Sequence, residues 1–141
     1  MSHDLSENQI QELIARARET MGQAYAPYSR FRVGAALLTK NGRIFTGCNV
    51  ENASYGLTNC AERTAVFKAV SEGDKGISAL ALIADTDDYC VPCGACRQVM
   101  AEFGDFPVIQ ANRAGAYKIN NVSELLPGAF SGAVLPGRVV E

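Results

Sequence analysis

Two short cysteine motifs constrain the fold of this chain more than any other feature. One is CAER from Cys60, and the other is PCGAC from Pro92. Inside a helix, Cys60 and Glu62 would point about 200° apart, so they can serve one metal ion only at the start of a helix. Cys93 and Cys96 are three residues apart, a spacing that puts both side chains on one face of the next helix. The sequence therefore predicts two helix N-termini that converge on one metal ion.

The thiols and the carboxylate of these motifs suit a hydrolytic zinc centre. A structural zinc site is closed by four protein ligands, whereas a catalytic site keeps three and leaves the fourth position for water. The candidate ligands number three: Cys60, Cys93 and Cys96. The only histidine, His3, lies in a polar N-terminal stretch, so a histidine-based centre is not expected. Glu62 is then the simplest candidate for the general base.

The residues around the motifs allow other interpretations. A CxxC pair alone is often a structural zinc knuckle or a redox pair. Cys48 is better explained as a buried small hydrophobe and Cys90 as an ordinary loop thiol, although either could close the fourth position. Arg63 is placed to offset the charge of the thiolates by hydrogen bonding to the sulfurs. Arg97 fits a solvated helix position as well as a functional one.

Composition sets the class of protein. The chain has 141 residues and is 48% hydrophobic, which predicts one domain over residues 1–141 with a real core. Its 13 basic and 15 acidic residues give a net charge of −2, so neither nucleic acid nor an anionic membrane is an expected partner. The start, MSHDLSENQ, lacks the pattern of a signal peptide, and the apolar run 77–84 is too short to span a bilayer. We therefore expect a cytoplasmic protein that binds a small molecule or another protein chain.

Hydrophobic periodicity predicts alternating helices and strands in one sheet with helices packed on its faces. Ser6 and Gln9 form a candidate capping box before the first helix, and Asn41-Gly42 is a candidate hairpin turn. Ser123 could cap a short final helix. In the first expected helix, apolar residues recur at helical spacing from Ile10 to Met21. The other expected helices are 60–70 and 94–103, and the expected strands are 31–39, 44–50, 77–84, 107–112 and 117–121.

The sequence resembles the homotetrameric zinc-dependent cytidine deaminases over nearly the whole chain. The resemblance lies in four segments: PYSRFRVGAAL from Pro27, NVENASYGLTNCAER from Asn49, PCGACRQV from Pro92 and LLPGAFSG from Leu125. It implies an α/β fold of three α-β-α layers, a mixed central sheet with helices on both faces. It also implies one Zn²⁺ per chain, bound by the three cysteines of the motifs, and a proton shuttle at Glu62.

The same resemblance assigns the substrate contacts. Asn49 and Glu51 would hold the ribose hydroxyl, Phe31 would pack on the pyrimidine ring, and Ala61 would also contact the substrate. Neighbouring subunits would complete each pocket with two aromatic residues, Tyr55 and Phe130. Apart from the resemblance, an amide and a carboxylate two residues apart on an extended segment can point the same way and bind a sugar.

The expected reaction is the hydrolytic deamination of cytidine and deoxycytidine to uridine and deoxyuridine, with release of ammonia, as in pyrimidine salvage. Two alternatives stay open. A related deaminase could act on another aminopyrimidine compound such as blasticidin S, but the pair Asn49 and Glu51 favours a plain nucleoside. A zinc-stabilised interaction module is the other alternative, and it would have no use for a carboxylate beside the metal.

Overall fold

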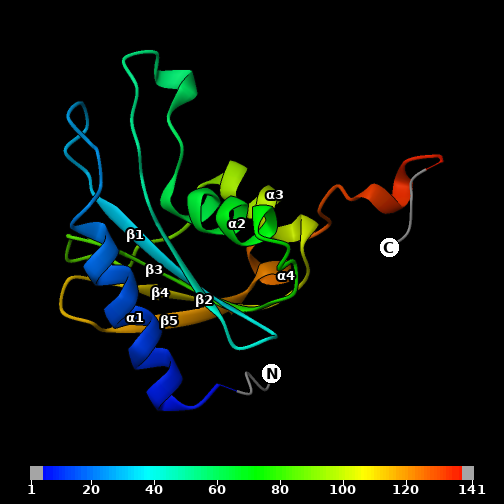
Figure 1. The fold of residues 1–141 in the computed structure, drawn as a ribbon, viewed down its shortest axis with the longest axis horizontal. Coiled ribbons are helices and arrows are strands. Elements are labelled where there is room, and N and C mark those ends of the chain that lie inside the picture. The colour runs from blue at the N-terminus through cyan, green and yellow to red at the C-terminus, as the bar shows by residue number, and fades with distance from the viewer. Residues whose placement is uncertain (1–4, 138–141) are drawn as a thin grey trace.

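Helix α1 (Glu7–Met21) begins at the capping box that the sequence predicts (Figure 1). The Ser6 hydroxyl accepts a hydrogen bond from the Gln9 main chain at 3.1 Å, and the Ser6 main chain donates to the Gln9 side chain at 2.9 Å. One face of the helix is buried, as the apolar spacing predicts: Ile10, Leu13, Ile14, Ala17 and Met21.

The first two strands, β1 (Val33–Thr39) and β2 (Ile44–Cys48), form the predicted antiparallel hairpin. Gly42 takes the left-handed conformation in the turn, with φ of 83°. Both strands are shorter than expected. Residues 31 and 32 lie outside β1 because the chain before them turns through Arg30 at φ of 59°. Val50 lies outside β2 and forms isolated bridges with Tyr25 and Asn59 instead.

The remaining elements follow in the expected order. They are η1 (Tyr55–Leu57), α2 (Ala61–Ser71), β3 (Ile77–Ala84), α3 (Gly94–Glu102), β4 (Pro107–Ala111), β5 (Tyr117–Asn121), α4 (Val122–Leu125) and η2 (Gly132–Val134). The prediction that Ser123 caps the last α-helix is wrong. Asn121 caps α4, and its main chain donates to the Glu124 side chain at 2.7 Å. The cap lies two residues earlier than predicted because β5 runs directly into the helix.

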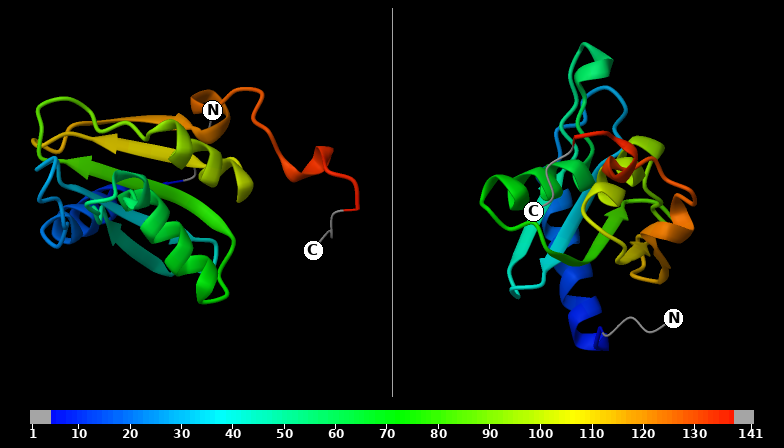
Figure 2. Two further views of the ribbon diagram at one scale, coloured as in Figure 1. Left: turned by 90° about the horizontal axis from the view of Figure 1, so that it is seen from above. Right: turned by 90° about the vertical axis from the view of Figure 1, so that its right-hand side faces the viewer.

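The five strands form one mixed sheet in the order β2-β1-β3-β4-β5, with β3 and β4 parallel and the other pairs antiparallel. Alternate residues of β1 face opposite layers. Ala35 and Leu37 belong to the core under α2 and α3, whereas Ala36 belongs to the core under α1. The predicted α-β-α layers are therefore confirmed, with α2 and α3 close together on one face (Figures 1 and 2).

Two glycines allow the helices to approach the sheet. A Cβ atom at Gly34 would lie 1.9 Å from the Ala17 carbonyl oxygen of α1. At Gly47 it would lie 2.5 Å from the Ala65 nitrogen and 2.6 Å from the Ala61 oxygen of α2. Gly47 thus sets the height of the N-terminal turn of α2 above β2.

The computed structural model describes residues 5–137, and in this part of the chain no helix is both long and apolar enough to cross a bilayer. Beyond α4, the described chain extends away from the sheet and its helices (Figures 1 and 2). In this C-terminal segment, residues 126–137, the side chains of Phe130 and Leu135 are exposed.

Candidate active site

The three predicted ligands meet at the N-termini of α2 and α3. Cys60 is the N-cap of α2, and Cys93 is the N-cap of α3. The Cys60 and Cys93 sulfurs are 3.8 Å apart, and the Cys93 and Cys96 sulfurs are 3.4 Å apart. All three sulfurs lie within 4.8 Å of one another, and within residues 5–137 they form the one cluster of potential metal ligands. The expected geometry at two helix starts is confirmed.

A positively charged side chain lies beside the cluster. The Arg63 guanidinium donates to the Cys60 sulfur at 3.2 Å, as predicted. Hydrogen bonds from Cys96 and Arg63 lower the pKa of the Cys60 thiol to about 5. Thiolates are the form of cysteine that binds metals, and helix N-termini favour them. The donor set therefore fits a soft, tetrahedral cation such as zinc and leaves one position for another ligand.

Glu62 lies in the first turn of α2, and its side chain is buried, with 4% exposed. Burial raises the pKa of its carboxyl group to about 7. A carboxyl group whose pKa lies near neutrality can both accept and donate a proton. Position and environment therefore suit Glu62 to proton transfer beside a metal.

Glu62 opens onto a pocket of about 210 Å³, large enough for a small aromatic ring. The side chain of Phe31, which is 47% exposed, lies in its wall. The lining residues come from the loop before β1, the segment after β2 and the two metal motifs: Ser29, Phe31, Val33, Asn49, Glu51, Thr58, Cys60, Ala61, Glu62, Cys90, Val91 and Cys93. The structure thus brings five of the predicted substrate and catalytic residues together: Phe31, Asn49, Glu51, Ala61 and Glu62.

The Asn49 side chain is tied to the main chain beside Phe31. Its oxygen accepts from the Val33 nitrogen at 2.9 Å, and its nitrogen donates to the Phe31 oxygen at 2.7 Å. An amide nitrogen carries a second hydrogen. Asn49 can therefore hold the loop and still donate one hydrogen bond into the pocket.

Glu51 is tied to the same loop. One carboxylate oxygen accepts from the main-chain nitrogens of Tyr28 and Ser29 at 2.9 and 3.1 Å. The other accepts from the Ser29 hydroxyl, which in turn accepts from the Phe31 nitrogen at 3.0 Å. The sequence did not reveal these contacts, because Ser29 and Glu51 are far apart in the chain. Ser29 lines the pocket together with Val33, Thr58 and Val91, although the sequence predicts no role for any of these four residues.

The two aromatic residues that the resemblance assigns to a neighbouring site are both exposed. Tyr55 is 74% exposed, and its ring centroid lies 5.9 Å from that of Tyr28. These rings line an outer hollow of about 300 Å³ that shares Ser29, Glu51 and Thr58 with the inner pocket. Phe130 is 62% exposed and lines neither hollow, although its carbonyl oxygen accepts from Gln98 of α3 at 2.9 Å.

Neither additional cysteine belongs to the metal cluster. Cys48 is half-buried at the end of β2, so it is less enclosed than expected. Cys90 lies in a loop, as predicted, but it is not an ordinary surface thiol, because its side chain is buried in the core and lines the pocket. Burial raises its pKa to about 12. Arg97 is structural, since its guanidinium donates to the carbonyl oxygens of Pro92 and Leu125 at 2.8 Å each.

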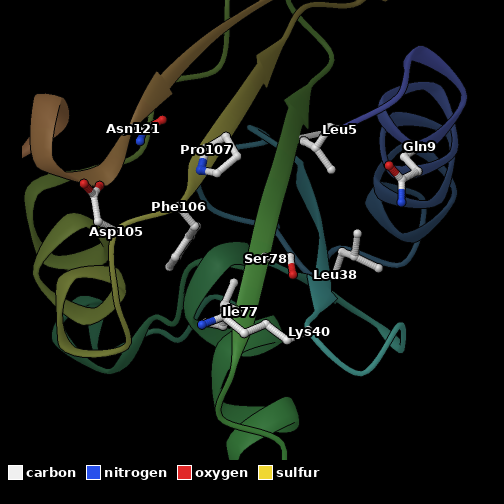
Figure 3. Close-up of a pocket in the computed structure, with 10 residues that line it drawn as sticks. All are labelled: Leu5, Gln9, Leu38, Lys40, Ile77, Ser78, Asp105, Phe106, Pro107 and Asn121. Carbon is white, nitrogen blue, oxygen red and sulfur yellow. The ribbon is translucent and has the colours of Figure 1, made fainter. Parts of the chain in front are cut away.

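A separate hollow of about 330 Å³ lies at the end of the sheet opposite the cysteine cluster (Figure 3). It is lined by the first residues of β3 and β4, including Ile77, Ser78 and Pro107, and by Leu5 and Gln9 near the start of α1. The PCGAC motif follows the other end of β3. This hollow contains none of the predicted site residues.

Comparisons with known proteins agree with this site. Residues 7–111 match the family model of the cytidine and deoxycytidylate deaminase zinc-binding region. Cytidine deaminase of Halalkalibacterium halodurans is 58% identical over 123 residues, which cover 86% of this chain and 93% of the relative. That of Sporosarcina psychrophila is 55% identical over 124 residues, with 86% and 91% covered. The crystal structure of cytidine deaminase from Burkholderia pseudomallei superposes with a TM-score of 0.84 at 47% identity, covering 89% of this chain and all of the other.

Proposed function

The chain belongs to the family of cytidine and deoxycytidylate deaminases, and we propose that it catalyses the zinc-dependent hydrolytic deamination of cytidine and deoxycytidine. Water supplies the new oxygen at C4 of the ring, and the amino group leaves as ammonia. The observation that carries this proposal is the buried Glu62 carboxyl group, which lines one small pocket together with two of the three clustered cysteines.

The chain's own residues account for the proton transfers. Zinc, when bound by the three thiolates, supplies Lewis-acid activation of water. Glu62 accepts a proton from the water that adds to C4 and delivers it to ring N3. It then takes the second proton from the new C4 hydroxyl and delivers it to the departing amino group. A pKa of about 7 suits both halves of this cycle. Arg63 offsets the negative charge of the thiolates through its hydrogen bond to Cys60.

The other pocket residues support a nucleoside as substrate. Phe31 offers a ring face to the pyrimidine, and the buried Ala61 adds apolar surface. Asn49 keeps a free amide hydrogen, and Glu51 keeps acceptor capacity, so this pair can bind sugar hydroxyls.

A turnover assay with metal analysis tests this function. The purified protein is incubated with cytidine, and uridine, ammonia and bound zinc are measured, with blasticidin S as the competing substrate. Conversion of cytidine supports the proposal. Conversion of blasticidin S alone would favour the related deaminase, and bound zinc without turnover of either compound would favour an interaction module.

We further propose a homotetramer in which Tyr55 and Phe130 complete the pockets of adjacent chains. Exposed apolar side chains support it, because interfaces between identical chains are more apolar than the remaining surface and are enriched in aromatic residues. The exposed side chains are Tyr55, Leu57, Phe130 and Leu135. Mixing a Glu62→Gln chain with a Phe130→Ala chain tests the sharing. Some mixed pockets would then regain both groups, so activity should exceed that of either parent. Mixed tetramers that are confirmed by mass and yet remain inactive would rule the sharing out.

Three broader proposals accompany this function. We place residues 1–141 in one catalytic domain, since a single sheet positions both cysteine motifs. A cytoplasmic location is supported by five free cysteines, which suit a reducing compartment. A role in pyrimidine salvage follows from the reaction, because it converts a cytosine nucleoside into a uracil nucleoside.

A further inference from the structure

We propose that Ser29 is a positioning residue, which directs the Glu51 carboxylate toward the sugar of the bound nucleoside. This inference rests on the proposed function, in which Glu51 binds sugar hydroxyls. It concerns a residue outside the metal motifs, on the loop that leads into β1.

The hydrogen bonds of the Ser29 side chain run in one direction, from the Phe31 nitrogen through the Ser29 hydroxyl to the Glu51 carboxylate. Its hydroxyl oxygen accepts from the Phe31 nitrogen at 3.0 Å, so the hydroxyl hydrogen is free to point at Glu51, which accepts it. The Ser29 hydroxyl is also the main cause that lowers the pKa of Glu51. Glu51 is thus held as a carboxylate in one orientation.

The carboxylate has little remaining freedom. A carboxylate accepts about four hydrogen bonds. The loop provides three donors, namely the main-chain nitrogens of Tyr28 and Ser29 and the Ser29 hydroxyl. About one acceptor position is left for a ligand, and a sugar hydroxyl is a donor that fits it.

The backbone conformation of this loop is energetically costly, so the hydrogen bonds maintain a conformation that the chain would not adopt without them. Arg30, between Ser29 and Phe31, has φ of 59°, a left-handed conformation that non-glycine residues adopt at a cost. Such residues are often found at functional sites, held by surrounding contacts. Asn49 independently holds Phe31 through the Phe31 carbonyl oxygen. Loss of the Ser29 hydroxyl should therefore affect Glu51 more than the ring of Phe31.

The test compares two substrates on three zinc-loaded variants. For Ser29→Ala, we expect kcat/KM with cytidine to fall about 10-fold, mainly through KM, because a hydrogen bond to a charged group is lost. With 2′,3′-dideoxycytidine, which offers no ring hydroxyl to Glu51, the loss should be less than about 2-fold. Ser29→Thr keeps a hydroxyl and should restore most of the cytidine activity. Ser71→Ala is the matched control, since its exposed hydroxyl bonds only within α2.

Each outcome decides the question. Equal losses with both substrates would mean that Ser29 merely supports the loop, and the positioning role would be refuted. No loss with cytidine would refute it as well. Ser29 is exposed, so its truncation should leave folding intact, which thermal unfolding checks. If the wild-type protein does not turn over cytidine at all, the proposed function itself fails, and that result is distinct from any outcome for Ser29.

Discussion

Substituting Gly47 by alanine should disturb the metal centre, although Gly47 binds no metal. The new Cβ atom would lie 2.5 Å from the Ala65 nitrogen, 2.6 Å from the Ala61 oxygen and 2.9 Å from the Thr64 Cβ atom. The first two are main-chain atoms and the third is a Cβ atom, so no side-chain rotation can relieve the clash. Ordinary contact begins at 3.4 Å, so the first turns of α2 must retreat by about 1 Å.

This displacement would carry Cys60, the N-cap of α2, away from the cysteines of α3. Zinc–sulfur distances are about 2.3 Å and vary by about 0.2 Å. A shift of about 1 Å therefore exceeds what the ligand set tolerates. Overpacking of this kind costs about 1–3 kcal/mol of unfolding free energy, and misplacement by 1 Å can reduce catalysis about 10²-fold.

Thermal unfolding, a zinc competition titration and cytidine turnover measure these effects on the same preparations. Gly22→Ala is the control, because its Cβ atom would lie 3.3 Å from the nearest atom, at the end of α1. We expect Gly47→Ala to lower Tm, zinc affinity and kcat/KM together, and the control to change none of them appreciably. A Gly47→Ala protein with wild-type zinc affinity and Tm would refute the close contact between β2 and α2.

Other variants separate the roles within the site. Glu62→Gln should keep zinc and fold but lose turnover by about 10²–10⁴-fold or more, as measured by kcat at matched zinc content, because an amide cannot accept the proton. Arg63→Gln should weaken zinc binding and reduce kcat/KM about 10-fold, since outer hydrogen bonds to ligands commonly contribute that much. Cys48→Ala and Cys90→Ala should retain zinc by metal analysis. Zinc should be lost from the variants in which a ligand is replaced by alanine: Cys60, Cys93 and Cys96.

The metal centre could be predicted from the sequence because its geometry is local. Cys60 and Cys93 each precede a helix by one residue, and Cys96 follows Cys93 at helical spacing. Helix starts are set by neighbouring residues, so the motifs fix their own orientation. Only the meeting of the two helices requires the fold, and the sheet provides it because both helices pack on the same face.

The substrate loop could not be predicted in the same way. Its shape depends on the contacts of Glu51 and Asn49 with residues about twenty positions earlier. The left-handed conformation of Arg30 follows from those contacts. It turns the chain, so β1 begins at Val33 and not at residue 31, where the sequence predicts its start. Burial of Cys90 likewise arises from packing against distant core residues. Long-range pairing of this kind leaves no periodic signal in the chain.

Titration of the metal-free protein with zinc, with cytidine turnover measured at each step, tests the central claim most directly. Three clustered thiols with one open position should bind about one zinc ion per chain. Uridine formation should therefore rise in proportion to bound zinc and reach its plateau at about one equivalent. Turnover without zinc, or full zinc occupancy without uridine formation, would contradict a three-cysteine deaminase centre.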